Sequence, residues 1–284
     1  MSVSKSTIIS GRRILITGFC GSIGEELTRQ LCVKNKVYGI DQNETGVVDL
    51  VEELKHKGHW VEGRVGNIKD METVRDVFSD FKPQITFHVA ALKHVFPAES
   101  FPLEYIKTNI LGTYNVLHTA RNWSSTEKVV YISTDKVINA RSIMGATKRV
   151  GEIMARNFGY IAVRFGNVLG SRGSVIPFWQ NQINRGDPMT VTDERMERYF
   201  MTISQACELV IEAAQEGKPG ETLVLDMGKP VNVYELAKKV LAESGANVGI
   251  KMIGIRPGET LYEKLMTEEE EKASFKRGKF IVIP

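Results

Sequence analysis

The chain has 284 residues, of which 42% are hydrophobic and 25% are charged, and its formal net charge is +3 at pH 7. This length accommodates one large α/β domain, alone or with a smaller lobe, and the composition is ordinary for a globular protein. So small a net charge argues against a dedicated nucleic-acid-binding protein. The three cysteines, Cys20, Cys32 and Cys207, show no paired spacing, so neither a disulfide framework nor a metal site is expected.

The sequence predicts a cytoplasmic protein. Residues 1–11 are polar and lack the apolar core of a signal peptide, so we interpret them as an N-terminal extension. We expect no membrane segment, because no apolar run approaches the roughly 20 residues that a membrane-spanning helix needs.

Short apolar runs with the character of buried strands recur through the first 166 residues. Each run is nearly continuous, as strands covered on both faces should be. They are residues 14–17, 37–40, 85–89, 129–133 and 161–165.

Helical patterns separate these runs. Ile23, Leu27 and Leu31 lie at i, i+4 and i+8, and a second apolar face follows the candidate N-cap Asp70. Its members are Val74, Val77, Phe78 and Phe81. Alternation of strands and helices predicts right-handed βαβ units and a Rossmann-type, doubly wound parallel sheet over residues 12–166.

The alternation loosens after about residue 166. Residues 170–174 and 185–188 carry loop signals, and helices are predicted over residues 204–216 and 232–243. The apolar face of the last helix comprises Val233, Leu236, Ala237 and Val240. The acidic run 268–271 is expected on a solvated helix face. We expect residues 167–284 to form mainly a smaller C-terminal substrate-binding lobe that is interleaved with the sheet.

A glycine-rich turn follows the first predicted strand. Gly18, Gly21 and Gly24 have the spacing G-x-x-G-x-x-G between a strand and a helix. Glycines there permit close approach of the backbone to a pyrophosphate, and the helix N-terminus supplies N–H groups and the positive end of its dipole. The turn therefore predicts a dinucleotide site. Its other expected cofactor contacts are Cys20, Ser22 and Ile23.

Asp41 bears on the choice between NAD and NADP. It ends the second predicted strand, 17 residues after Gly24, where a carboxylate can hydrogen-bond both ribose hydroxyls. A carboxylate would repel a 2′-phosphate, and residues 42–44 include no arginine. The sequence therefore favours NAD over NADP. Further expected cofactor contacts are Asn67, Ile68, Ala90, Ala91, Lys93 and Asn109, whereas His88 is interpreted as a satisfied core histidine.

Six short blocks then occur in order along the chain. They are residues 90–95 (AALKHV), 107–109 (KTN), 133–136 (STDK), 145–148 (GATK), 164–175 (RFGNVLGSRGSV) and 256–259 (RPGE). With a glycine spacing typical of extended short-chain dehydrogenase/reductases, they resemble the UDP-N-acetylglucosamine 4,6-dehydratase family, some members of which also invert C5. The resemblance covers about residues 12–266. Related sugar dehydratases carry a glutamate in place of Lys136, and most 4-epimerases carry neither acid nor base there.

The resemblance implies roles for Asp135 and Lys136. Oxidation of the sugar at C4 acidifies the C5 proton, which a base removes while an acid protonates the departing C6 hydroxyl. The resemblance makes Asp135 the acid and Lys136 the base. We expect Lys136 to be neutral because the positive charges of Lys148 and an oxidised nicotinamide lower its pKa, and Asp135 to be protonated because the site is desolvated.

Met144 stands where the family carries a tyrosine. Lys148, four residues later on the same helix face, is implied to bind the nicotinamide ribose. The tyrosine would take the C4 hydroxyl proton, whereas a thioether has no ionisable group. A branch of the same family, mostly larger membrane-attached proteins, also carries methionine here. We expect Thr134, or a water held by Thr134 and Lys148, to relay the proton instead.

The resemblance also implies contacts to a UDP-sugar substrate. Arg256 is expected at the pyrophosphate, which suits a planar guanidinium, and Glu259 at the uridine ribose. Arg195 and Arg198 are further candidates, although a charge-rich stretch is equally explained as a solvated loop. The remaining candidates are Lys93, Asn167, Arg172 and Ser174.

The sequence is thus interpreted as an NAD(P)-dependent nucleotide-sugar 4,6-dehydratase of the polysaccharide-biosynthesis type. A nucleotide-sugar 4-epimerase or ketoreductase is the alternative enzyme, against which Asp135 and Lys136 argue. A catalytically impaired cofactor-binding protein is the third reading, supported by Met144 alone. The helices that begin near Met144 and near residue 109 commonly form a dimer interface in such enzymes, so we expect a homo-oligomer.

Overall fold

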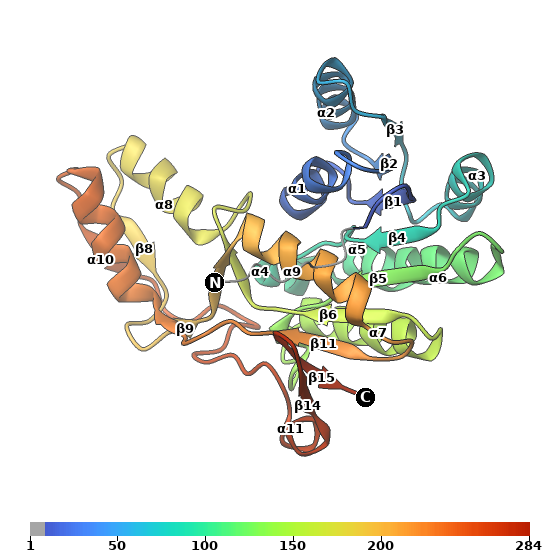
Figure 1. Cartoon of the computed structure of the whole chain (residues 1–284). Coiled ribbons are helices and arrows are strands. Elements are labelled where there is room, and N and C mark those ends of the chain that lie inside the picture. The colour runs from blue at the N-terminus through green and yellow to red at the C-terminus, as the bar shows by residue number, and fades with distance from the viewer. Residues whose placement is uncertain (1–8) are drawn as a thin grey trace, which may run out of the picture.

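A computed structural model describes residues 9–284 of the chain (Figure 1). Residues 1–8, which belong to the expected N-terminal extension 1–11, lie outside the described residues. A nine-stranded sheet forms the centre. Its strands are β1 (Arg13–Thr17), β2 (Lys36–Asp41), β3 (Val61–Val65), β4 (Ile85–His88), β5 (Lys128–Ile132), β6 (Ile161–Arg164), β11 (Thr222–Leu225), β14 (Phe275–Arg277) and β15 (Phe280–Ile283).

The strand order is β14-β15-β11-β6-β5-β4-β1-β2-β3. The run from β3 to β11 is parallel, whereas β15 pairs antiparallel with both β11 and β14. The chain leaves β1 in one direction for β2 and β3 and returns for β4, β5 and β6. The order therefore reverses beside β1, and open α/β sheets bind ligands at the carboxyl ends of strands at such a point.

Helices cover both faces of the sheet because successive strand residues point to opposite sides. On one face Ile14 and Ile16 pack under α1 (Ser22–Leu31), α2 (Glu44–His56) and α9 (Ile203–Glu216). On the other face Leu15 packs under α3 (Met71–Phe81), α6 (Thr113–Asn122) and α7 (Ile143–Asn157). The predicted Rossmann-type doubly wound fold is confirmed.

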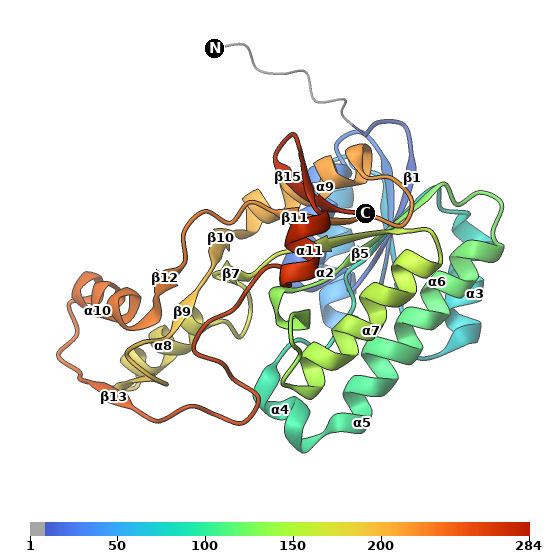
Figure 2. The same ribbon diagram turned by 90° about the horizontal axis from the view of Figure 1, so that it is seen from below.

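The second part of the structure is a small lobe beside the carboxyl ends of the strands (Figures 1 and 2). Its helices and strands are α8 (Val175–Asn184), α10 (Val233–Ser244), β7 (Asn167–Leu169), β8 (Met189–Val191), β9 (Glu197–Arg198), β10 (Phe200–Thr202), β12 (Val231–Asn232) and β13 (Ile250–Met252). The strands pair as β7–β10, β9–β12 and β8–β13. The lobe has its own core around the fully buried Trp179. The chain leaves the lobe between its segments and again after them. In these parts α9 packs on the sheet, and β11, β14 and β15 add strands to it.

Most predicted elements lie within one or two residues of the observed ones. Asp70 caps α3 by accepting a hydrogen bond from Glu72 N, and the face of α10 that contains Val233 and Ala237 packs into the lobe core. Helix α8 was not predicted. None of the helices within residues 9–284 is both long and apolar enough to cross a bilayer.

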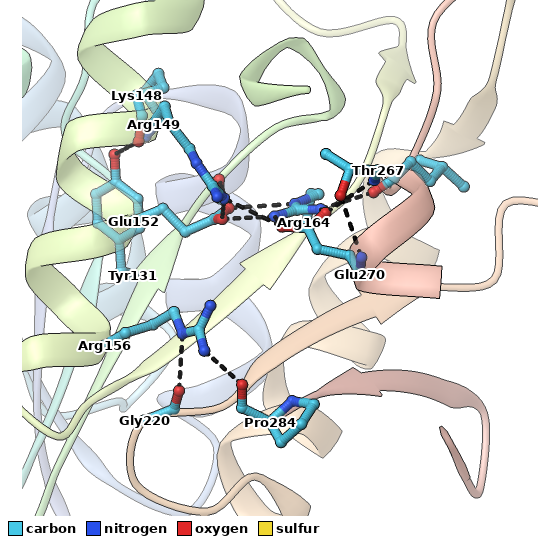
Figure 3. Close-up of polar contacts among 12 residues, drawn as sticks. Tyr131, Lys148, Arg149, Glu152, Arg156, Arg164, Gly220, Thr267, Glu270 and Pro284 are labelled. Carbon is cyan, nitrogen blue, oxygen red and sulfur yellow. Dashed lines mark hydrogen bonds and ion pairs between the residues drawn. The ribbon is translucent and has the colours of Figure 1, made fainter. Parts of the chain in front are cut away.

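The acidic run 268–271 forms the helix α11 (Glu268–Ala273), but the expected solvated face is wrong for Glu270. The Glu270 carboxylate is buried against Arg164, which donates to it from Nη1 at 2.8 Å and from Nη2 at 3.1 Å (Figure 3). Arg164 also donates to Glu152 of α7 at 2.5 Å. This network joins β6 to α7 and to the C-terminal helix.

Candidate active site

A cavity of about 1440 Å³ lies at the carboxyl ends of the parallel strands, between the sheet and the small lobe. Its walls include residues directly after β1, β2, β4, β5 and β6, residues of β8 and β9, and the loop 253–264. This volume is larger than a single drug-sized ligand requires.

The glycine-rich turn forms one wall of the cavity through Gly18, Gly21, Ser22 and Ile23. Gly18 has a φ of +71°, and a Cβ atom there would lie 2.7 Å from the Ala90 backbone. Side chains are therefore excluded from the turn, and its backbone stays open to a ligand. The N-terminus of α1 begins immediately after it.

Two predicted contacts of the turn do not line the cavity. A Cβ atom on Gly24 would lie 2.1 Å from Gly18 O, so Gly24 allows α1 to pack against the turn. The Cys20 thiol is buried, and Cys20 N donates to Asp41 Oδ2 at 3.0 Å. Cys20 and Gly24 therefore shape the cradle instead of facing a ligand.

Asp41 lines the cavity at the end of β2. Its carboxylate accepts hydrogen bonds from Cys20 N and Asn43 N, both at 3.0 Å, which fix its orientation. Asn67 and Ile68 line the same end of the cavity. An open glycine turn, a helix N-terminus and an oriented carboxylate fit the pyrophosphate and ribose of a dinucleotide.

Asn109 does not line the cavity. Its side chain is fully buried and donates to Leu92 O at 2.9 Å and to Thr147 Oγ1 at 3.0 Å, while its Oδ1 accepts from Leu92 N at 2.8 Å. Asn109 thus fixes the loop after β4, whose residues Ala90, Ala91 and Lys93 do line the cavity.

His88 lies in the core below this loop. It is hydrogen-bonded to Thr17 Oγ1 at 2.7 Å and to Thr113 Oγ1 at 2.9 Å. Burial lowers the His88 pKa to about 3, so the ring is neutral. The interpretation as a satisfied core histidine is confirmed.

Thr134, Asp135 and Lys136 line the cavity directly after β5, where the chain makes the short 3₁₀ segment η2 (Asp135–Val137). Asp135 Oδ1 accepts from Thr134 Oγ1 at 2.9 Å and from Lys136 Nζ at 3.0 Å. The other oxygen, Oδ2, is buried, and no donor among residues 9–284 reaches it. The Asp135 side chain is completely buried, whereas that of Lys136 is 20% exposed.

Glu263 joins this pair and was not predicted. Its Oε2 lies 3.1 Å from Lys136 Nζ, and its Oε1 lies 3.3 Å from Arg198 Nε. Lys136 Nζ also donates to Asn167 Oδ1 at 3.2 Å. The feature of the sequence that points to Glu263 is its position four residues after the RPGE block.

The charges in this cluster differ from those expected. Burial disfavours the ammonium of Lys136, yet the carboxyl groups of Asp135 and Glu263 outweigh burial and raise the Lys136 pKa. Burial likewise disfavours the Asp135 carboxylate, but Lys136 and the hydrogen bonds to Asp135 lower its pKa. The prediction of a neutral Lys136 and a protonated Asp135 is therefore wrong for the free protein. Among neighbouring cations, Arg198 lowers the Lys136 pKa.

Burial instead raises the Glu263 pKa to about 7, with the charge of Asp135 acting in the same direction against Lys136 and Arg198. Glu263 is therefore about half protonated near neutral pH.

Met144 and Lys148 lie on the same face of α7 and both line the cavity. The helix begins after Ser142, whose hydroxyl accepts from Gly145 N at 3.0 Å. Met144 is 2% exposed and packs with Ala98 and Tyr105. Burial lowers the Lys148 pKa to about 7, and its Nζ donates to Ile132 O.

On the lobe side the cavity brings together Asn167, Ser174, Arg198, Arg256 and Glu259. Ser174 Oγ is buried, and within residues 9–284 it has no hydrogen-bond partner, so it is available to a ligand. Arg198 is buried and donates to Thr260 O at 2.6 Å and to Leu261 O at 3.0 Å, which rules out the solvated reading for this residue.

The other two arginines predicted to contact the substrate, Arg172 and Arg195, are engaged by other partners. Arg195 is outside the cavity, 67% exposed and paired with Asp193 at 2.9 Å. Arg172 lines the cavity, but its guanidinium donates to Cys20 O and to Glu25 Oε2, and its N–H donates to Ser22 Oγ at 2.9 Å. Arg172 therefore joins the lobe to the glycine-rich turn.

Residues 14–284 match the model of a protein family described as "Polysaccharide biosynthesis protein". The chain belongs to this family. The capsular polysaccharide biosynthesis protein CapD of Staphylococcus aureus is 43% identical over 277 residues, which are 92% of this chain and 46% of CapD. The chain thus spans about half the length of that family member. The expected polysaccharide-biosynthesis relationship is confirmed.

Two further proteins extend the comparison. A UDP-glucose 4-epimerase of Rickettsia typhi is 32% identical over 289 residues, covering 96% of this chain and 83% of the epimerase. The crystal structure of Pen from Bacillus thuringiensis superposes with a TM-score of 0.93 at 34% identity, covering 98% of this chain and 90% of Pen. The fold of the family is therefore shared over nearly the whole chain.

Proposed function

We propose that this chain is an NAD-dependent nucleotide-sugar 4,6-dehydratase that acts on UDP-N-acetylglucosamine. The proposal depends on one observation, the buried pair Asp135–Lys136 in a cavity that is also lined by the glycine-rich turn. A 4-epimerase transfers hydride at C4 and needs no acid and base for C5 and C6. An acid–base pair held 3.0 Å apart in that cavity favours elimination of water.

The cofactor would be held by the glycine turn at its pyrophosphate, by Asp41 at the adenine ribose and by Lys148 at the nicotinamide ribose. When bound, NAD supplies reversible hydride transfer between C4 and C6 of the sugar. Within residues 9–284 the Asp41 carboxylate has no arginine or lysine among its hydrogen-bond partners and would repel a 2′-phosphate, which supports NAD over NADP.

Asp135 and Lys136 supply the elimination. One proton moves along the hydrogen bond from Lys136 Nζ to Asp135 Oδ1, which produces a neutral amine and a neutral acid together. Lys136 then takes the C5 proton, and Asp135 donates its proton to the C6 oxygen, which leaves as water. Afterwards Lys136 is an ammonium and Asp135 a carboxylate again, and a solvent proton reaches C5.

The proton of the C4 hydroxyl needs a route that does not involve Met144. We assign it to Thr134 Oγ1, or to a water held by Thr134 and Lys148. Because the Lys148 pKa is about 7, about half of this residue is an amine at neutral pH and accepts that proton. Met144 contributes an apolar wall that helps to exclude other water.

The substrate would lie along the lobe side of the cavity. Arg256 suits the diphosphate, Ser174 Oγ offers an unused hydrogen-bonding group, and Glu259 is assigned to the uridine ribose. Asn167, Lys93 and Arg198 also line the cavity and are assigned to the sugar.

A homo-oligomer is proposed from the outer surface of η1 (Ile106–Gly112), α6 and α7. These neighbouring segments expose apolar side chains, namely Leu111, Tyr114, Val150 and Ile153. An apolar surface of this kind is typical of a subunit interface. Light scattering on the purified protein tests it, since a monomer mass at micromolar concentration contradicts it.

The reaction is tested by incubating purified protein with NAD and UDP-N-acetylglucosamine and weighing the sugar product by mass spectrometry. We expect the mass of the product to be lower than that of the substrate by one water. An unchanged mass with a new 4-epimer would instead establish the epimerase that the Rickettsia relative is named for.

A further inference from the structure

Glu263 is the only carboxyl group of the described cavity that contacts Lys136 without being its chain neighbour. It lies in the loop after the RPGE block, and its side chain is 6% exposed. The charged and polar groups that face it are Asp135 and Lys136 from η2, Asn167 from β7 and Arg198 from β9. Nothing in the dehydration scheme above uses it.

We propose that Glu263 is a positioning residue that controls the Asp135–Lys136 pair, which works only while Glu263 carries a proton. This inference rests on the proposed dehydratase function and names the regulation of that same site.

The first step of the argument concerns Lys136. An ionised Glu263 would place a second negative charge 3.1 Å from Lys136 Nζ, in addition to Asp135 Oδ1 at 3.0 Å. Two carboxylates at these distances in a buried site hold the ammonium form strongly. Lys136 could then not release the proton that it must lose before it acts as a base.

The second step concerns Asp135. Its Oδ2 is buried without a donor, and leaving such an atom unpaired costs about 1–3 kcal/mol. Asp135 Oδ1 and Glu263 Oε2 lie 3.0 Å and 3.1 Å from the same Lys136 Nζ, so the two carboxyl groups are neighbours. A proton on Glu263 removes the second negative charge beside this incompletely paired carboxylate and so prevents repulsion between the two.

The protonation state of Glu263 therefore decides whether Lys136 can release its proton. With Glu263 protonated, Lys136 has Asp135 as its one anionic partner, and a single proton can pass between them. With Glu263 ionised, Lys136 stays charged. Burial and the charge of Asp135 raise the Glu263 pKa to about 7, so the change falls near neutral pH.

The test is the pH dependence of kcat for wild type and for Glu263→Gln. A glutamine keeps the size of the side chain and provides an N–H donor at every pH, so it imitates the protonated residue. Wild type is expected to be most active near pH 7, because the Lys148 amine is lost below this pH and the Glu263 proton is lost above it. Glu263→Gln should keep its rate within about tenfold of the wild-type maximum and should lack the decline on the alkaline side.

Glu268→Gln, on the exposed side of α11, is the matched control and should retain the wild-type profile. The proposal is overturned if Glu263→Gln keeps the decline, if wild type shows none, or if a folded Glu263→Gln protein is as inactive at every pH as Asp135→Asn.

A measurement without substrate separates this proposal from the proposed function. Carboxyl ¹³C NMR of the free protein should show Glu263 titrating near pH 7, and Asp135→Asn should lower that pKa because it removes the neighbouring charge. Titration near the ordinary value of 4.5 overturns the role of Glu263 even if the protein is a dehydratase. Titration near 7 without any loss of water from UDP-N-acetylglucosamine would contradict the reaction alone.

Discussion

Two buried groups of charged side chains lie in this molecule, and they are built differently. In the first, which we call the structural cluster, Arg164 lies between Glu152 and Glu270, and each carboxylate oxygen of both glutamates has a donor (Figure 3). In the second, the cavity cluster of Asp135, Lys136, Glu263 and Arg198, one oxygen of Asp135 has no donor among the described residues.

The difference shows that burial alone does not decide the charge of a carboxyl group. The side chains of Glu270 and Glu263 are 10% and 6% exposed. Burial raises the pKa of both, but hydrogen bonds from Arg164 outweigh it and lower the Glu270 pKa to about 2. Glu263 faces another carboxylate, and its pKa rises to about 7. A fully paired cluster stabilises the fold, whereas an incompletely paired one retains a proton to exchange.

The largest expected effect comes from removing Lys136, the proposed base of the cavity cluster. Lys136→Met should lower kcat for water loss by about 10³-fold, because the C5 proton then has no acceptor. Lys251→Met, at an exposed position of β13, is the control and should be as active as wild type. Turnover of the Lys136 variant within tenfold of wild type would remove Lys136 from the mechanism.

Breaking the structural cluster should act on stability instead. Arg164→Met leaves Glu152 buried without its main cation, and we expect the free energy of unfolding to fall by about 3–5 kcal/mol. The exposed pair of Arg12 and Glu127 provides the comparison, since Arg12→Met should cost less than about 1 kcal/mol. Urea denaturation of both variants measures the contrast, and equal losses would contradict it.

Removing the proposed proton relay should have a smaller effect on turnover. Thr134→Ala deletes the hydroxyl that lies 2.9 Å from Asp135 Oδ1, and kcat should fall by about a hundredfold. Thr134→Ser keeps the hydroxyl and should retain most of the rate. If turnover of the alanine variant is undiminished, Thr134 has no part in the relay.

The smallest expected effect is on the pH dependence of the free energy of unfolding under acidic conditions. Because folding depresses the Glu270 pKa from 4.5 to about 2, its contribution is present above pH 4.5 and is lost as the pH falls towards 2. Glu270→Gln should flatten the free energy of unfolding over that interval. Glu268→Gln should leave the slope unchanged, and the same slope in both variants would contradict the assignment.

Local sequence patterns predicted much of the fold. The five strands predicted from apolar runs match β1, β2, β4, β5 and β6 to within one or two residues, since each run is covered on both faces. The glycine spacing predicted the turn after β1, where Gly18 has a φ of +71° that glycine adopts without strain.

The cavity cluster could not be predicted in full because tertiary structure assembles it. Glu263 is 127 residues from Lys136 in the chain, and no local pattern connects them. The same holds for Glu270, which belongs to an acidic run but meets Arg164 106 positions away. The protonation state of Lys136 depends on Asp135 and Glu263, and only folding brings Glu263 to it.

The central claim is that Lys136 and Asp135 remove the C5 proton and the C6 hydroxyl of a UDP-sugar. The most direct test is turnover of UDP-N-acetylglucosamine with NAD in deuterated water, with the product analysed by NMR. The account predicts a 4-keto-6-deoxy sugar with solvent deuterium at C5, and the coupling constants then show whether C5 is inverted. A product that retains its C6 hydroxyl and carries no deuterium at C5 would contradict it.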